Sequence, residues 1–269
     1  MLSSTISHVY REHGRSLIKC IKKARTLAEK PVHQLRLDIK SIRALLELMD
    51  NISEKKTEGQ ATRRMLRPLF RKAGKLRTTA LNLQLTQPYH SAVLMKFKRY
   101  LRKKQSIEGE KLLKSLKNIE PKKLGRLQKR TLSAVKKSDN EKLTIQAVEH
   151  LRDLLAGVRG DLFDINVDES LHEIRRQLKR VRNIGQLLEE AGVDHPFKEE
   201  LKRVGRTYEK IGKWHDTVDL IKELEKFVDR LHDPKGLEKA IPVIVKLKKE
   251  SLKNKRQIAR KLRTDLVRP

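Results

Sequence analysis

The sequence predicts an all-α protein, and the spacing of its apolar residues is the main observation behind this prediction. Leu, Ile and Val recur three and four positions apart along most of the 269 residues, which places them on one face of a helix. No stretch shows the alternation of apolar and polar residues that is typical of a half-buried strand. Only 12 glycines and 8 prolines occur, and Pro31, Pro88, Pro121 and Pro196 each precede a helical stretch, where proline is tolerated.

The prolines and polar runs divide the chain into expected helices. Pro31 should begin the second helix, and Pro68 should kink or break the third, because proline lacks a backbone donor and crowds the preceding turn. The fifth stretch should be interrupted near Pro121. The expected ranges are, in order, 4–28, 31–49, 56–85, 91–105, 109–137, 141–159, the helix that carries His172, 197–231 and 236–266.

A twelve-residue motif occurs twice, 139 residues apart. The first copy, VHQLRLDIKSIR at 32–43, and the second, LHEIRRQLKRVR at 171–182, each carry a histidine followed by basic residues three, seven and ten positions later. On a helix these four positions form one stripe, and the apolar positions between them form a second stripe beside it. Each copy is therefore expected to be a helix with one face for the core and one face for anions.

The repeat extends beyond the motif. At the same offset Ile6 corresponds to Ile145 and Val9 to Val148, and KAGKLR at 72–77 corresponds to KIGKWH at 210–215. We expect two halves that each resemble a four-helix bundle and are related by internal duplication, with a basic central channel between them. The first bundle should cover 1–138 and the second 139–269, with the boundary in a short polar run at 137–140.

The charge of the chain indicates a polyanionic partner. Lys and Arg number 64 against 34 Asp and Glu, a net charge of +30 that repels itself in a compact fold. Nucleic acid, polyphosphate, an anionic membrane and an acidic protein all fit this charge. Aromatic residues form only 4% of the chain, fewer than a protein that stacks single-stranded bases usually carries.

The cysteine content and the N-terminus predict a cytoplasmic protein. Cys20 is the single cysteine, so it cannot form an internal disulfide, and we interpret it as a small buried hydrophobic residue. The first residues lack the apolar region of a signal peptide. A run of about 18 apolar residues, as a membrane span needs, is also missing.

The motif residues have the chemistry of phosphate ligands. Arginine offers a planar fork to pairs of phosphate oxygens, and lysine offers a mobile point charge. His33 and His172 are expected in the first turn of their helices, where free N–H groups and the helix dipole favour anions. Further basic rows, which alone would be solvated faces, are Arg64, Arg67 and Arg71, and Arg203, Arg206, Lys210 and Lys213.

The two motif copies, each followed by a long helix with Gly-Lys, resemble the conserved histidine α-helical domain, or CHAD, family over nearly the whole chain. The resemblance implies a pair of four-helix bundles whose basic central pore binds inorganic polyphosphate, which would allow targeting to polyphosphate granules. The residues that would bind it are His33, Arg36, Lys40, Arg43, Lys75, Arg77, His172, Arg175, Lys179, Arg182, Lys213 and His215. Their neighbours Lys72, Arg180, Arg206 and Lys210 complete the predicted site.

The sequence departs from the family pattern mainly in its first half. Ser41 stands where the family usually has a second basic residue, and Thr78 follows Arg77 where the family usually has aspartate. The second half keeps this aspartate as Asp216, after His215. We therefore expect the second half to resemble the family more closely.

A metal site, phosphoryl transfer and nucleic-acid binding are the alternatives to polyphosphate binding. The spacing of a zinc site is absent, and the cations on each histidine stripe would repel a metal ion, so neither metal nor cofactor is expected. Phosphoryl transfer is suggested only by three acids, Asp216, Asp219 and Glu223, and their spacing fits a helix surface better. No Gly-rich phosphate loop and no E-x-E-x-K signature accompanies them, so no enzyme is expected. Nucleic-acid binding is the main alternative, because a charge of +30 attracts DNA or RNA at low salt.

Overall fold

The computed structural model describes residues 1–52, 58–163, 167–231 and 234–266, and in these parts of the chain all regular structure is helical. The all-α prediction is confirmed. The first half contains α1 (Leu2–Lys23), a 3-10 turn (Ala24–Thr26), α2 (Glu29–Ile52), α3 (Gly59–Leu85), α4 (Ala92–Lys117) and α5 (Pro121–Lys136). The second half contains α6 (Asn140–Phe163), α7 (Val167–Glu190), α8 (Lys198–Leu231) and α9 (Pro234–Leu266).

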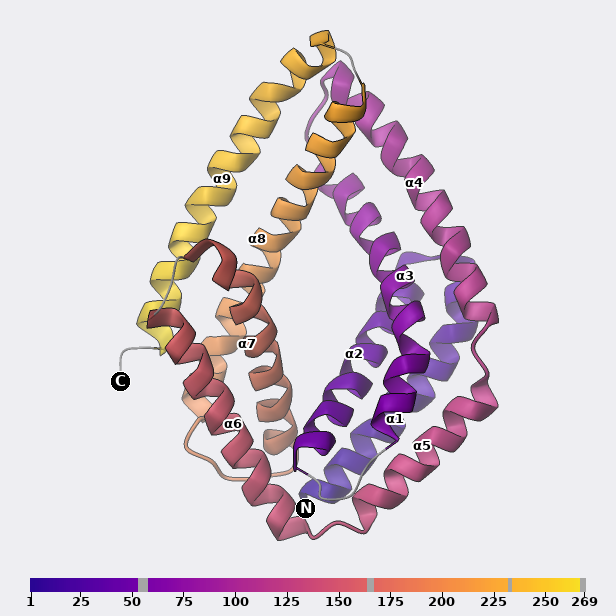
Figure 1. Ribbon diagram of the computed structural model, residues 1–269, viewed down its shortest axis with the longest axis vertical. Helices are drawn as coiled ribbons and strands as arrows, with labels where there is room; N and C mark the ends of the chain where they lie inside the picture. The colour runs from indigo at the N-terminus through magenta and orange to yellow at the C-terminus, as the bar shows by residue number, and fades with distance from the viewer. Residues whose placement is uncertain (53–57, 164–166, 232–233, 267–269) are drawn as a thin grey trace.

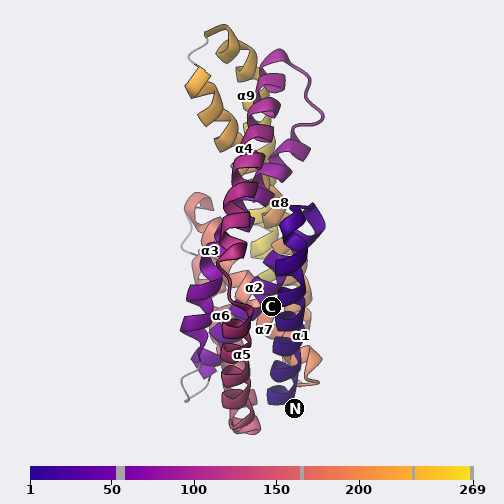
Figure 2. The ribbon, with the colours of Figure 1, turned by 90° about the vertical axis from the view of Figure 1, so that its right-hand side faces the viewer.

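The helices form an elongated molecule with the two motif helices near its centre. In Figure 1, α1–α5 lie on one side and α6–α9 on the other, and α2 and α7 face one another across the lower half. The same molecule is narrow when turned by 90° (Figure 2). Helices α4, α8 and α9 extend to the upper tip, so the two halves meet again there.

Two hydrophobic clusters hold this arrangement together. The larger one contains buried residues from all of the α-helices, including Leu35 and Leu178 of the motif helices and the free thiol of Cys20. The smaller one joins Phe97 of α4 to Leu224 and Phe227 of α8, together with residues of α9. The loop at 137–139 lies where the boundary between halves was expected, but side chains of both halves share each cluster. Duplication of the two halves stays a prediction.

The expected helices differ from the observed ones mainly around α4 and the prolines. Helix α4 is continuous over 92–117, because Glu108 and Gly109 are buried in the contact with its neighbours and strong helix formers surround them. The break expected between 105 and 109 was wrong. Pro121 begins α5, where its missing N–H has no partner to lose, and α3 continues through Pro68.

The correspondence expected between the helices that precede the motifs was also wrong in detail. Ile6 is buried with 1% of its surface exposed, whereas Ile145 is 53% exposed. The buried positions of α1 instead match positions of α6 that lie two residues later than expected. In each helix the buried side chains recur every three or four residues along one face, and these two faces correspond. The matching buried pairs are Leu2 and Leu143, Ile6 and Ala147, Tyr10 and Leu151, Leu17 and Val158, and Ile21 and Leu162.

Candidate functional site

The apolar stripes of α2 and α7 are buried as predicted, which turns their basic stripes toward the space between the two helices. Leu35, Ile39 and Ile42 of α2 are at most 1% exposed, and the corresponding Ile174, Leu178 and Val181 of α7 are fully buried. The basic residue that directly follows each of these apolar residues remains partly or fully exposed beside this core. The helical period alone therefore places both rows of cations at the edge of the hydrophobic core.

A buried carboxylate on the back of α2 fixes the rotation of this helix. Asp38 is completely buried and accepts hydrogen bonds from Ser16 Oγ of α1 at 2.7 Å and from Gln34 Nε2 at 3.0 Å. Its Oδ1 lies 3.0 Å from His13 Nδ1 of α1. Since a buried carboxylate without partners is unstable, this network holds α2 against α1 with its basic stripe on the opposite side.

Four cations meet where α2 and α7 face one another. Burial, and then the charges of Lys179 and Arg36, lower the pKa of Lys40 from 10.5 to about 8. Burial, Arg77 and Arg175 lower the pKa of Arg36 to about 10. Burial and then Arg43 lower the pKa of Lys179 as well. Within the described part of the chain, no carboxylate forms an ion pair with Arg36, Lys40, Arg175 or Lys179, so their positive potentials add.

Aromatic rings from the long helices hold the arginines at both sides of this cluster. Phe70 of α3 lies 5.1 Å from the guanidinium of Arg36 and 5.2 Å from that of Arg43. In the second half, Tyr208 of α8 lies 5.9 Å from Arg175 and 5.7 Å from Arg182. Such contacts attract a cation to the ring face without neutralising it, so the guanidinium edges stay available for an anion.

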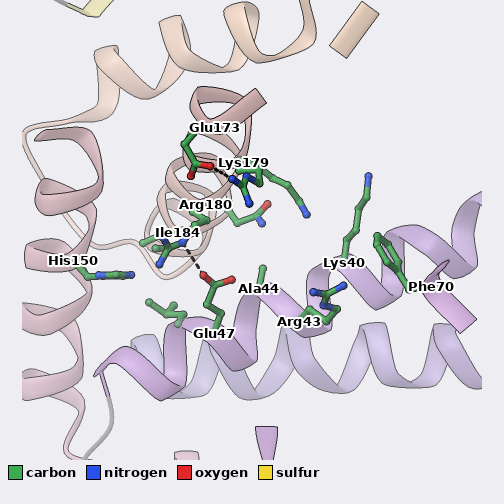
Figure 3. Close-up of a pocket in the computed structure, with 13 residues that line it drawn as sticks. Lys40, Arg43, Ala44, Glu47, Phe70, His150, Glu173, Lys179, Arg180 and Ile184 are labelled. Atoms are coloured by element: carbon green, nitrogen blue, oxygen red, sulfur yellow. Dashed lines mark hydrogen bonds and ion pairs between the residues drawn. The ribbon is translucent and has the colours of Figure 1, made fainter. Parts of the chain in front are cut away.

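Two cavities adjoin the cation cluster and share Arg43 and Phe70 in their walls. The first, of about 410 Å³, lies between α2, α3, α6 and α7 (Figure 3). The second, of about 600 Å³, lies between α2, α3, α4 and α8. The cations lining the first are Lys40, Arg43, Arg176, Lys179 and Arg180, and those lining the second are Arg36, Arg43, Arg67, Arg71, Lys75 and Lys104.

The other predicted site residues differ in how close they lie to the cation cluster and the two cavities. Arg77 lies close enough to His33, Arg36 and Lys40 to lower the pKa of each, and it pairs loosely with Glu29 at 3.9 Å. The predicted members that line neither cavity are His33, Lys72, Arg77, His172, Arg175, Arg182, Arg206, Lys210, Lys213 and His215. Of these, Arg206, Lys210 and Lys213 are exposed on α8.

Some residues at the cavities were not in the predicted site. Lys104 and Arg176 were missed, and Arg67 and Arg71 had been interpreted as a solvated face. Phe70 and Tyr208 were also missed, although they stand 138 positions apart, the offset that relates Gly74 to Gly212. That shared offset was the signal in the sequence that could have revealed them.

The two histidines lie in the second helical turn, and the expectation of the first turn was wrong. Helix α2 begins at Glu29 and α7 at Val167, so the free N–H groups of each helix end precede the histidine. Burial and then Arg77 lower the pKa of His33, whose Nδ1 is buried without a hydrogen-bond partner. Burial and then His215 lower the pKa of His172. Both rings are therefore mainly neutral at pH 7 in the free protein.

His215 and the acids of α8 lie beside the second histidine. The His215 ring packs edge-on against His172 with centroids 4.7 Å apart, and its Nδ1 lies 3.2 Å from Asp219 Oδ2. Burial raises the pKa of Asp216, and the charges of Arg175 and His215 counteract this rise.

In the part of the chain with described side chains, no group of three or more His, Cys, Asp or Glu residues is arranged to hold a metal ion. Nor is any described helix long and apolar enough to span a membrane.

Replacing Gly74 by alanine is expected to weaken anion binding without unfolding α3. A Cβ at this position would lie 2.5 Å from Arg36 Nη1, so the guanidinium, which lines the second cavity, would have to shift away from position 74. Loss of most of one charge-assisted contact corresponds to roughly a tenfold loss of affinity. Alanine should also stabilise the helix by up to about 1 kcal/mol.

Gly212→Ala is the matched control for this substitution. No atom lies within 4 Å of a Cβ placed there, so the gain in helix stability should come without a change in affinity. Thermal melts and titrations with polyphosphate would compare the two variants. Equal affinities would show that Arg36 does not contact the ligand from its present position.

These features define an all-α protein in which two basic motif helices face one another beside cation-lined cavities. The sequence model of the CHAD domain matches residues 9–225, and the chain therefore belongs to the CHAD-domain family. The crystal structure of the CHAD domain from the plant Ricinus communis is similar, with a TM-score of 0.75 and 17% identity over 100% of this chain and 92% of that chain. At 17% sequence identity, this similarity shows that the two proteins share a fold. No curated protein matched the sequence.

Proposed function

We propose that this protein binds inorganic polyphosphate, without catalysis, in the space between α2 and α7. The observation that carries the proposal is the cluster of Arg36, Lys40, Arg175 and Lys179, which lies partly buried with no ion pair to a described carboxylate. Such a cluster destabilises the free protein, and an anion with closely spaced charges removes the repulsion. Membership in a family that is generally associated with polyphosphate binding supports the same ligand.

A linear phosphate chain fits the shape of the cluster better than a compact anion. The basic stripe from His33 to Arg43 covers roughly 15 Å of α2, at about 1.5 Å per residue. The cations continue into both cavities, which adjoin at Arg43 and Phe70. Binding of this kind would bring the protein to polyphosphate granules in the cytoplasm.

The acids near the cluster support a role in binding alone. Glu223 accepts a hydrogen bond from Tyr100 and pairs with Lys104, and Asp219 pairs with His215. Of this row only Asp216 has no such described partner, whereas enzymes that transfer phosphoryl groups usually hold Mg²⁺ with one or two carboxylates together with the substrate phosphates. At most one carboxylate of the row is therefore available for such a role.

Competition between polyphosphate and DNA would test the proposal. The central cations face a space between helices rather than a convex outer surface, so a duplex cannot reach all of them together. At about 150 mM salt, where nonspecific attraction to DNA is weakened, polyphosphate should displace DNA and excess DNA should not displace polyphosphate. Polyphosphate incubated with the protein and Mg²⁺ should keep its chain length. Equal competition by DNA, or progressive shortening of the chain, would contradict the proposal.

A further inference from the structure

The first cavity contains a carboxylate that spans the two motif helices. Glu47 lies one helical turn after Arg43 on α2, and its Oε1 is 2.7 Å from Nε of Arg180 on α7. Figure 3 shows this pair closing one side of the cavity, with Lys179 of α7 and Lys40 of α2 further along. Both side chains remain accessible, at 48% for Glu47 and 38% for Arg180.

Glu47 acts on the same cations that a phosphate in this cavity would contact. Its charge raises the pKa of Lys179, against the stronger lowering by burial and Arg43. It also holds Arg180, a side chain able to take phosphate oxygens in pairs. Arg180 therefore differs from the four cations of the central cluster, none of which forms an ion pair with a described carboxylate.

The other acids at the two cavities are bound differently. Glu173 pairs with Arg176 on its own helix and does not connect α7 to α2. Glu223, in the second cavity, is 18% exposed and is held by Tyr100, whose hydroxyl donates to it over 2.8 Å, and by Lys104. Glu108, also in the second cavity, is 6% exposed and pairs with Lys111 of its own helix. Of the four acids Glu47 has the most exposed side chain and pairs across the two motif helices, so it is the acid that a ligand displaces most easily.

We propose that Glu47 is an internal competitor for the polyphosphate site, which occupies Arg180 in the free protein and is displaced by the ligand. The inference rests on the proposed function of the same site. The displaced carboxylate stays close to the bound phosphates, and the like charges repel. Glu47 thereby weakens binding and limits the site to ligands with enough negative charge to displace it, while it links α2 to α7 when the site is empty.

Glu47→Gln is the variant that tests this role, and Glu225→Gln is its matched control. Glu225 forms an exposed pair with Lys248 at 2.6 Å, lines neither cavity, and its replacement changes the net charge by the same amount. With long-chain polyphosphate at low salt, E47Q should bind about three- to fivefold more tightly, the effect expected of one charge at a partly exposed site. E225Q should stay within about twofold of the unmodified protein, because its charge is screened from the site.

A double-mutant cycle with Arg180→Gln separates local competition from a general charge effect. R180Q should bind more weakly, and adding E47Q to it should produce a smaller gain than in the unmodified protein. Glu47→Asp, which keeps the charge, should bind with nearly the original affinity. Circular dichroism and melting curves would establish that each variant is folded. We expect the variants to fold, because the side chains of Glu47 and Arg180 are both accessible to solvent.

The outcomes distinguish this inference from the proposed function. Equal gains in E47Q and E225Q would overturn the inference, because net charge alone would then explain them. A loss of affinity in E47Q would also overturn it, since Glu47 would then support the ligand. If the unmodified protein fails to bind polyphosphate, the proposed function itself is wrong.

Discussion

Replacing Arg36, Lys40, Arg175 and Lys179 together by methionine is expected to abolish polyphosphate binding and to raise the thermal stability of the free protein. Each hydrogen bond between a charged donor and a phosphate contributes about 1.5–3 kcal/mol, so loss of four should weaken binding by at least about 1000-fold even without full additivity. Methionine keeps most of the unbranched carbon stem, so packing against the core is largely retained.

The stability of this variant should change in the opposite direction to its affinity. The four cations are partly buried and repel each other, and replacing partly buried charges by apolar groups of similar volume is often stabilising by about 1–4 kcal/mol. For a chain of this size, the melting temperature should rise by at least about 3 °C at low salt. A variant that merely misfolds would lose both binding and stability.

A control with the same loss of charge distinguishes the site from the overall charge of the protein. Arg102 and Lys103 of α4 and Lys249 and Arg256 of α9 are exposed and line neither cavity. Their joint replacement by methionine should reduce affinity by less than about tenfold, since exposed charges are largely screened at 150 mM salt. Titration calorimetry and differential scanning fluorimetry would compare both variants. If the two bind equally, the ligand is held by the overall charge of the surface.

The structure explains why the sequence predicted the orientation of the two motif helices. Arg36, Lys40, Arg175 and Lys179 share a helix with the apolar stripe that packs into the core, and one helical period relates the two stripes. Once Leu35 and Leu178 are assigned to the core, the orientation of the cations beside them is determined. The burial of both apolar stripes confirms this part of the prediction.

The rest of the site depends on packing between helices that no local pattern reveals. Lys104 reaches the second cavity because α4 packs beside α3 and α8, and its partner Glu223 lies 119 positions away in the sequence. Arg206, Lys210 and Lys213 were predicted from their regular spacing, but a long helix such as α8 has several polar faces. Spacing shows that residues share a face, whereas only the tertiary contacts decide which face borders the cavity.

The second large effect concerns pH, and Lys40 is expected to dominate it. The pKa of Lys40 is about 8 in the folded protein, against 10.5 for an ordinary lysine, so the unfolded chain binds more protons between these two values. The free energy of unfolding should therefore increase as pH rises from about 8 to about 10.5, and the full destabilisation, about 3 kcal/mol, is present below pH 8. Melting curves at low salt would show this rise, and Lys40→Met should remove most of it.

Ligand binding should have the opposite dependence on pH in the same range. A bound phosphate favours the charged amine and raises the pKa of Lys40, so binding at pH 9 should take up protons and weaken as pH increases. Calorimetry in two buffers with different ionisation enthalpies would measure this uptake, which should disappear in Lys40→Met. The two histidines have lowered pKa values and should add a separate uptake only at acidic pH. An affinity that stays constant from pH 7.5 to pH 10 would place the phosphate chain away from Lys40, since a charge in direct contact with the ligand cannot be lost without a change in binding.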